Sequence, residues 1–380
     1  MILKLSTFFH MPITECFVSS LIVSDGTCTG VIYRDFKSGE VSPFNAKSVI
    51  LATGGSGRLF HTNTASIDST ADGTALAYRA GVSLKDMEMV QFTPTSLKSR
   101  GILITDMVRS IGARFVDSQG NPITTEDTPG DLETATRDIC ARAIQTKISS
   151  SEQSYAYLDL RHLNKDQLNE SIPETQALIE DLAELEITEE LVPIRPAMHR
   201  PIGGISIDVN GMTNISGLYA AGECANAGVH GANRLGGNSL LDCIVIGERS
   251  GRSASEYAQQ TAQTLASPGL LSDEDRNTRS LLAEAKSKDT PGELRRELSN
   301  VMAKHVGIFR NERGLKEARR SVETLSERYT KLGARNQRST YNSEVRTILE
   351  LGNMIDIARV IIASAFERTE SRGSHFRQDY

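Results

Sequence analysis

The feature that most constrains this chain is a glycine-rich segment between an expected strand and an expected helix. Residues 228–240 read Gly-Val-His-Gly-Ala-Asn-Arg-Leu-Gly-Gly-Asn-Ser-Leu. The apolar stretch 217–224 before them predicts a short strand that ends in glycine, and an amphipathic helix is predicted from Leu240 to about Tyr257. A strand, a glycine-rich loop and a helix start place backbone N–H groups where they can face an anionic or dipolar ligand. Arg234 lies in this loop among small residues, so its guanidinium can approach a carboxylate in bidentate fashion.

The composition narrows the class of protein. A length of 380 residues is enough for two or three domains. The net charge of −6, with acidic and basic residues interspersed, argues against nucleic acid as the main partner. The five cysteines form no C-x-x-C pair, so we expect neither a disulfide framework nor an iron–sulfur or other metal site. No apolar run approaches the ~20 residues needed to span a bilayer.

By itself the glycine-rich segment has a plain structural interpretation, a turn with a solvated arginine. Other motifs favour a functional one. They are Ser48–Gly57, Ala71-Asp-Gly73, Asp86–Phe92, Thr136–Arg142, Tyr157–Leu160, Pro196–Gly204, Val306–Arg310 and Glu370–His375. In this order they resemble the flavoprotein subunits of succinate dehydrogenases and fumarate reductases, a family that also includes L-aspartate oxidase.

The resemblance implies a fold of the α/β plus α class. It would consist of a partial, Rossmann-like FAD-binding domain, an inserted α+β domain that caps the substrate, and a C-terminal helical domain. The FAD-binding domain would occupy residues 1–100 and 199–265. The capping domain would occupy residues 101–198, and the helical domain residues 266–380.

The same resemblance implies that FAD is the cofactor and assigns residues to it. The expected FAD contacts are Gly54, Gly55, Asp72, Glu223, Ser239 and Leu240. Glu223 would accept hydrogen bonds from ribityl hydroxyls, and the backbone at Ser239-Leu240 would face the flavin ring at a helix start.

The expected substrate is a dicarboxylate, succinate or fumarate. The resemblance assigns it to Thr93, Thr105, His199 and Arg234. An arginine and a histidine donor can polarise a carboxylate and make the adjacent alkene carbon electrophilic. Without the family, His199 would more readily be a satisfied structural histidine.

The resemblance also assigns catalysis to Arg137 as the acid, with Asp106 and Arg109 as its proton relay. Asp106 and Arg109 are spaced i, i+3 and share one helix face, with Asp in place of the family's Glu. The alternative from the residues alone is a surface ion pair and a helix-start charge, because arginine is normally always protonated.

Two positions depart from the family pattern. Thr93 replaces a histidine that usually contacts substrate, and Arg200 replaces the tyrosine that usually follows the motif's histidine. Thr93 still offers a hydrogen-bond donor but no positive charge. Both departures bear on the choice of substrate more than on the fold.

One expected motif is missing from the sequence. Dinucleotide-binding flavoproteins open with a strand that runs into Gly-x-Gly-x-x-Gly, and Gly54-Gly-Ser-Gly57 has the wrong spacing. We therefore interpret the chain as an internal fragment of a longer subunit that lacks the N-terminal unit and the extreme C-terminus.

The main functional interpretation is interconversion of succinate and fumarate by hydride transfer with FAD. Electrons would pass through an iron–sulfur subunit to quinone, and membrane anchor subunits would hold the protein peripherally on the cytoplasmic face of the membrane. One alternative is L-aspartate oxidase, which oxidises L-aspartate to iminoaspartate. The other is a non-catalytic fragment without bound FAD.

Overall fold

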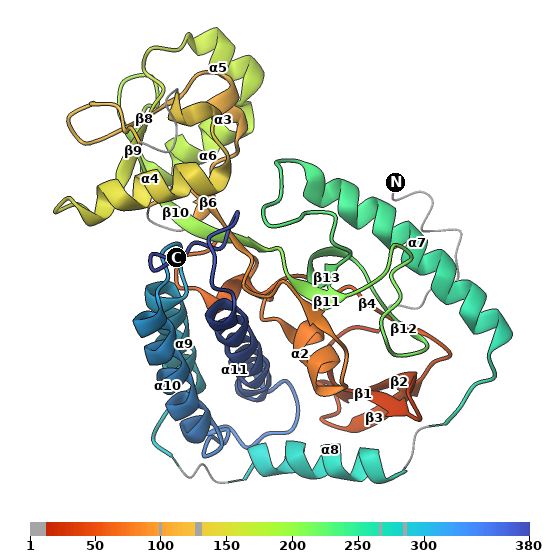
Figure 1. Ribbon diagram of the computed structural model, residues 1–380. Helices are drawn as coiled ribbons and strands as arrows, with labels where there is room; N and C mark the ends of the chain where they lie inside the picture. The colour runs from red at the N-terminus through yellow and green to blue at the C-terminus, as the bar shows by residue number, and fades with distance from the viewer. Residues whose placement is uncertain (1–12, 99–100, 126–130, 266–267, 284–286) are drawn as a thin grey trace.

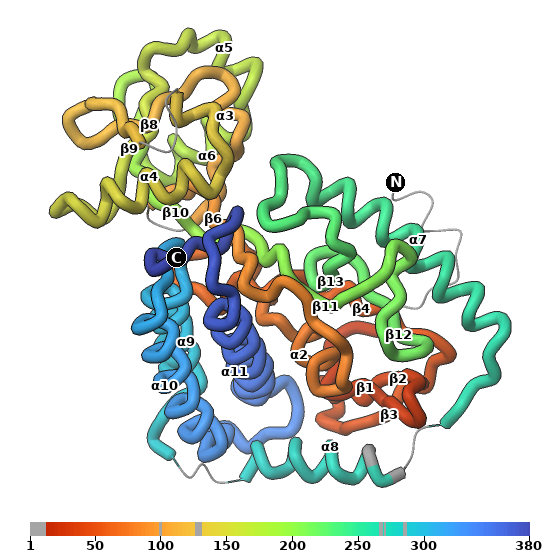
Figure 2. The backbone as a smooth tube through the Cα atoms, in the orientation of Figure 1, coloured from red at the N-terminus to blue at the C-terminus, as the bar shows by residue number. Residues whose placement is uncertain are grey.

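The computed structural model describes residues 13–98, 101–125, 131–265, 268–283 and 287–380. Three regions can be followed in Figure 1: a mixed region of small sheets, a cap above it, and a group of long helices. The tube in Figure 2 shows the chain leaving the mixed region for the cap and later returning to it. None of the described helices is long and apolar enough to cross a membrane.

The mixed region begins with two hairpins. β1 (Cys16–Ser24) and β2 (Thr27–Asp35) pair antiparallel, and β3 (Val41–Asn45) adds to β2. The first turn is Asp25-Gly26, whose residues have φ of +50° and +73°. Two consecutive positive φ values are those of a type I′ turn, which suits the twist of the strands.

The rest of the mixed region is built from segments far apart in the sequence. β4 (Val49–Leu51) pairs in parallel with β12 (Leu218–Ala220), which is the strand predicted before the glycine-rich segment. β11 (Gly204–Ser206) lies between β13 (Ala225–Asn226) and β5 (Leu84–Lys85). α2 (Asp72–Arg79) and the long α7 (Asn238–Gln260) pack against these strands. This confirms a strand, glycine loop and helix at 218–260.

The cap has a sheet and a core of its own. Its strand order is β7 (Ile102–Leu103), β6 (Val90–Leu97), β10 (Val192–Pro201), β9 (Ala156–Asp159) and β8 (Arg114–Val116). Its helices are α3 (Met107–Ser110), α4 (Arg137–Ser149), α5 (Lys165–Ser171) and α6 (Pro173–Ala183). A buried apolar cluster that includes Phe115, Ile144 and Leu158 joins these helices to the sheet.

Two long strands connect the cap to the rest of the chain. β6 begins at Val90 and β10 ends at Pro201, so their pairing extends beyond the expected cap boundaries at 101 and 198. Hydrogen bonding between two antiparallel strands continues for as long as their backbones stay adjacent. The sequence motifs do not show where this pairing ends, so they did not show where the cap ends. β6 and β10 therefore belong to both regions.

The C-terminal region is helical, as predicted. It comprises α8 (Pro268–Leu281), α9 (Pro291–His305), α10 (Glu312–Tyr329) and α11 (Ser343–Glu367). Thr290 and Glu293 form a capping box at the start of α9, and Asn311 and Asn342 cap α10 and α11. The buried faces of the last three helices share a core with Leu59, Phe60 and Met198.

The segment after α11 fastens this helical region to the mixed region. Arg310 is 1% exposed and donates to the Glu88 carbonyl (2.7 Å) and to His375 Nδ1 (2.8 Å). His375 Nε2 lies 3.2 Å from the Arg368 carbonyl. A carbonyl only accepts, so the ring proton is on Nε2 and Nδ1 receives the Arg310 hydrogen bond. Ser374 donates through both its backbone N–H and its hydroxyl to the Ala232 carbonyl in the glycine-rich loop, each at 2.9 Å.

We expect acid to destabilise this junction. Burial, and then the charge of Arg310, lower the pKa of His375 from 6.5 to about 4. The unfolded chain therefore binds a proton below pH 6.5 that the folded chain refuses until about pH 4, and stability falls as the pH drops through that window. The free energy of unfolding in urea should decrease from pH 7 to pH 5, and it should decrease less for His375→Gln, which keeps an acceptor for Arg310. An equal decrease in both proteins would show that His375 does not titrate in this way.

Candidate functional site

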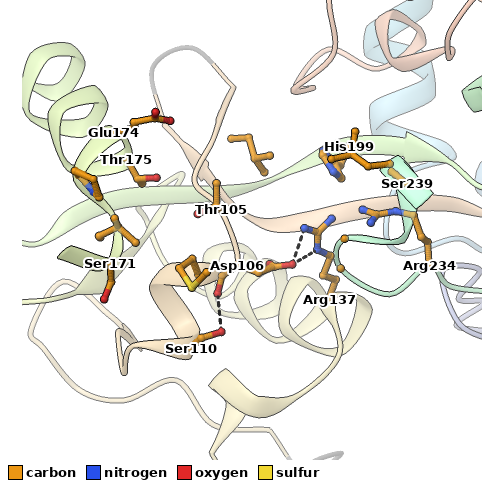
Figure 3. Close-up of a pocket in the computed structure, with 17 residues that line it drawn as sticks. Thr105, Asp106, Ser110, Arg137, Ser171, Glu174, Thr175, His199, Arg234 and Ser239 are labelled. Atoms are coloured by element: carbon orange, nitrogen blue, oxygen red, sulfur yellow. Dashed lines mark hydrogen bonds and ion pairs between the residues drawn. The ribbon is translucent and has the colours of Figure 1, made fainter. Parts of the chain in front are cut away.

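A cavity of about 830 Å³ separates the cap from the glycine-rich loop. The cap contributes Thr105, Asp106, Met107, Arg137 and the residues from Ser171 to Thr175. His199, Arg234, Gly236, Gly237, Ser239 and Leu240 line the other side. Figure 3 shows His199, Arg234 and Arg137 gathered at one end, with Ser171, Glu174 and Thr175 at the other. Most of the residues expected from the sequence to bind substrate or catalyse thus line one cavity.

The three residues expected to move a proton are in direct contact. Arg137 is the first residue of α4, and its Nε and Nη2 donate to Asp106 Oδ2 at 2.7 and 2.6 Å. Asp106 Oδ1 accepts from Arg109 Nη2 at 3.0 Å, and Arg109 Nη1 also donates to the carbonyls of Glu133 and Ala135. Burial raises the pKa of Asp106, but its bonds to Arg137 and Arg109 outweigh this and leave it below the usual value. Asp106 is therefore an ionised carboxylate shared by two guanidinium groups.

Gln91 joins the two arginines of the cavity, and sequence reasoning missed this role. The side chain of Gln91 is fully buried, and its Oε1 accepts from Arg234 Nη2 (2.8 Å) and from Arg137 Nη1 (3.3 Å). Its Nε2 donates to Asn233 Oδ1 (2.6 Å) and to the Arg234 carbonyl (2.7 Å). A polar residue in an otherwise buried strand was the only signal that could have indicated it. One amide thus holds two cations that would otherwise repel each other.

The cavity carries positive charge on arginines and none on its histidine. Arg234 is 3% exposed; burial and the charges of Arg137 and Arg200 lower its pKa to about 10, so it stays protonated at pH 7. Burial, followed by Arg137 and Arg234, lowers the pKa of His199 to about 3. His199 is therefore neutral, and its Nδ1 lies 2.8 Å from the Thr64 hydroxyl. A neutral imidazole can donate one hydrogen bond to a ligand without adding charge.

The structure separates the two threonines expected to bind substrate. Thr105 is exposed and lines the cavity. Thr93 is fully buried in β6 opposite Ala197, is not on the cavity wall, and its Oγ1 has no hydrogen-bond partner among the described residues. The family pattern alone could not show that this position is closed off here.

Arg200, the other departure from the family pattern, turns away from the cavity. Its guanidinium forms an ion pair with Asp242 at 3.0 Å and hydrogen bonds to the Ser239 hydroxyl. The β6–β10 register shifts between Met198 and Arg200, as at a β-bulge, so His199 and Arg200 do not simply alternate between two faces. Arg200 therefore cannot influence the choice of substrate through direct contact with it.

The glycines expected near the flavin have the backbone freedom that the position requires. Gly54 has φ of +76° and open space where a side chain would be. A Cβ on Gly55 would lie 2.3 Å from a carboxylate oxygen of Glu223, so only glycine lets Glu223 come this close. Glu223 has no ion pair or hydrogen bond among the described side chains. Burial raises its pKa, while Arg200 and Arg234 oppose the rise.

Ser239 and Leu240 lie in the first turn of α7, whose N-cap is Gly237 and has no side-chain cap. Leu240 is 73% exposed on the cavity wall. Asp72 differs from these residues, because its carboxylate already accepts from Thr70 (2.9 Å) and Asn353 (2.7 Å). Asp72 thus ties α2 to α11, and a role toward FAD stays a prediction. No group of three or more His, Cys, Asp or Glu side chains that could hold a metal ion occurs in the described ranges.

Comparisons with known proteins identify the family. Residues 7–240 match the FAD binding domain family, and residues 295–380 match the fumarate reductase flavoprotein C-terminal family. The chain belongs to the succinate dehydrogenase and fumarate reductase flavoprotein family. This family consists of FAD-dependent oxidoreductases, so the predicted family and cofactor are confirmed.

Two relatives of this flavoprotein illustrate the similarity in sequence. The fumarate reductase flavoprotein subunit of Mycobacterium tuberculosis is 36% identical over 391 residues, which cover 97% of this chain and 67% of the relative. The succinate dehydrogenase flavoprotein subunit of Rickettsia conorii is 33% identical over 381 residues, covering 96% and 64%. The chain thus spans about two thirds of the length of such relatives.

Solved structures of the family have the same fold. Quinol fumarate reductase of E. coli matches with a TM-score of 0.87 and 31% identity, covering 96% of this chain and 65% of that one. Mycobacterium smegmatis Sdh1 matches with a TM-score of 0.84 and 33% identity, covering 96% and 62%. The FAD-binding and helical parts of the predicted fold are thereby supported.

The residues of this flavoprotein fit the flavin half of FAD. The Glu223 carboxylate is half-buried and without a protein partner among the described residues. It lies against Gly55, beside a helix start that lacks a side-chain cap. These groups need hydrogen-bond partners such as ribityl hydroxyls and a polar ring edge.

We expect Gln91→Glu to weaken dicarboxylate binding. The variant keeps the shape and an acceptor oxygen, but its negative charge would offset one of the two positive charges of Arg137 and Arg234 and would repel an anionic ligand. Repulsion between close like charges costs several kcal/mol, so the dissociation constant of malonate should rise at least about tenfold.

Titration of malonate against the flavin absorbance measures this effect. Gln145→Glu, near the other end of α4, makes the same change of charge away from the cavity and serves as the control. Equal affinities for Gln91→Glu and the parent would mean that the two arginines do not bind the ligand.

Proposed function

We propose that this chain forms the dicarboxylate site of a flavoprotein that interconverts succinate and fumarate. The observation that supports this most is the contact of Arg137 with Asp106, in a cavity that also holds Arg234 and the neutral His199. Two guanidinium groups at one end of a cavity suit a ligand with two carboxylates. FAD, when bound, supplies the hydride donor and acceptor.

Arg234 and His199 would bind and polarise the substrate. Arg234 Nη1 and Nη2 already donate to the Leu235 carbonyl and to Gln91, which fix the plane of the guanidinium. Each of these two terminal nitrogens carries a second N–H, so donors remain for a ligand, and the Arg234 Nε is buried without a partner among the described residues. His199 beside Arg234, and Thr105 on the cap side of the cavity, would add neutral donors. Donors fixed in this way stabilise charge as it develops on a carboxylate.

Arg137 would deliver the proton that fumarate reduction requires. Its Nη1 has only the 3.3 Å contact with Gln91, while Nε and Nη2 are bound to Asp106. The Asp106 carboxylate and Arg109 behind it form a continuous hydrogen-bonded path away from Arg137. A proton lost from Arg137 would return along this path, with Asp106 and Arg109 as the relay.

We further propose that electrons pass to an iron–sulfur subunit and then to quinone, with membrane anchor subunits. Support comes from the names of the relatives, which are subunits of fumarate reductases and succinate dehydrogenases and include an 8-methylmenaquinol:fumarate reductase. A peripheral position on the cytoplasmic face of the membrane, through those partners, is part of the same proposal.

L-Aspartate oxidase remains the alternative within the same family. L-Aspartate is also a dicarboxylate, and the cavity described here would accept it as well as succinate or fumarate. Peroxide production driven by L-aspartate, measured beside fumarate reduction with reduced viologen dye, separates the two activities. A protein with neither activity and no flavin absorbance would be the non-catalytic fragment.

We expect Arg137→Lys to abolish fumarate reduction while flavin stays bound. Lysine keeps the charge but not the planar fork that contacts Asp106 through two nitrogens. Loss of general acid catalysis lowers turnover by ~10²–10⁴-fold. Steady-state fumarate reduction and the flavin spectrum test this, with Arg142→Lys, one turn further along α4 and paired with Asp138, as the control. Turnover of Arg137→Lys close to that of the parent would rule out its role as the acid.

We expect Thr93→Val to leave dicarboxylate affinity unchanged. The Thr93 hydroxyl is buried and unpartnered among the described residues, so exchanging it for a methyl group should be neutral or stabilising. Thermal unfolding and malonate titration measure both effects. A clear loss of affinity would instead show that Thr93 donates to the substrate, as the family pattern suggested.

A further inference from the structure

The two ends of the glycine-rich loop are tied together by one carboxylate. Asp242 Oδ2 accepts from His230 Nε2 at 3.2 Å and from Arg200 Nη2 at 3.0 Å. His230 lies near the start of the loop, and Asp242 lies in α7 just after its first turn. All three side chains are at most 8% exposed. Between the two tied residues lies Arg234.

Arg200 makes this tie rigid by holding the N-terminal end of α7 at two points. Its Nη1 donates to the Ser239 hydroxyl while its Nη2 bonds Asp242. Ser239 and Asp242 are three residues apart and so lie on one face of the helix. A planar guanidinium that bonds two groups in this way fixes direction as well as distance.

The loop needs such an anchor because its own backbone is permissive. Gly231 and Gly237 have φ of +55° and +81°, and open space surrounds both positions. The N-cap of α7 is Gly237, so no side chain of the loop fixes the start of the helix. Glycine loses more conformational freedom than other residues when it is ordered, so external contacts must hold the loop.

We propose that Arg200 is a positioning residue that acts through Asp242 and Ser239 to hold loop 230–242, and with it Arg234, in the geometry that binds the dicarboxylate. This rests on the proposed function for the role of Arg234. Arg200 itself does not bind the ligand: it is not on the cavity wall, and its terminal nitrogens bond Ser239 and Asp242. Gln91 holds the centre of the loop at Asn233 and Arg234, and Arg200 holds its end.

The test compares the parent flavoprotein with Arg200→Met, Asp242→Asn and the double variant. Methionine keeps much of the length of arginine without its hydrogen bonds. The matched control is Arg328→Met, which removes a guanidinium that bonds Asp289 through Nε and Nη2 in the helical region. Malonate affinity is read from the flavin spectrum, stability from thermal unfolding, and loop order from amide hydrogen exchange of residues 230–242.

We expect Arg200→Met to raise the malonate dissociation constant roughly tenfold, as displacement of a binding group does. Asp242→Asn and the double variant should show the same loss rather than a larger one, because each removes the same tie. Exchange in residues 230–242 should quicken in all three variants and not in Arg328→Met. Lower melting temperatures with unchanged affinity and unchanged loop exchange would overturn the proposal, since Arg200 would then be only structural.

The failure of the proposed function would look different. If the parent binds no malonate and reduces no fumarate, the assignment of the substrate fails. Hydrogen exchange then decides the role of Arg200 alone: faster exchange confined to residues 230–242 supports it, and unchanged exchange overturns it.

Discussion

The pairing of β6 with β10 is the interaction on which the site depends. These strands are separated by almost the whole cap in sequence, yet they lie side by side and enter the mixed region together. Where the paired strands pass from the cap into the mixed region, Gln91 on β6 lies beside His199 and Arg200 on β10. If the two strands were to separate, the cap would lose its connection to the loop, and the arginines would lose the amide that holds them.

The contacts at this passage of β6 and β10 also explain how three buried arginines coexist in a small volume. Burial, and then the charges of Arg137, Arg234 and Arg200, lower the pKa of His199; burial, and then the charges of Arg137 and Arg200, lower the pKa of Arg234. Each is offset by a different polar group: Asp106 for Arg137, the Gln91 amide for Arg234, and Asp242 for Arg200. Only Arg234 lacks a carboxylate partner in an ion pair. A cation that is buried without its counter-ion is the one that benefits most from an anionic ligand.

Much of the fold could be predicted from local patterns. Asp25-Gly26 set the first hairpin, Thr136 and Asn164 mark the starts of α4 and α5, and the amphipathic runs after Pro268 became helices. These features depend on neighbours in sequence. The pairing of β4 with β12 could not be derived in this way, because strands of three residues carry too little pattern to specify a distant partner.

The sequence predicted which residue types form the site better than it predicted the directions in which their side chains point. Arg137, Asp106 and Arg109 lie together as the resemblance implied, whereas Gln91 was missed and Thr93 proved to be buried away from the cavity. The register shift at His199 is the main physical reason. Simple alternation places neighbouring residues on opposite faces, but an extra residue in one strand redirects the side chains around it.

The same register shift also sets the direction of Arg200, the residue that departs from the family pattern on β10. Because β10 gains a residue at His199, the following side chain reaches the start of α7 rather than the cavity. A tyrosine there has one hydroxyl and could not bond Ser239 and Asp242 through separate donors. Arginine can do so, and Asp242 can then also hold His230. The departure at position 200 is therefore best understood as a change in how the glycine-rich loop is supported.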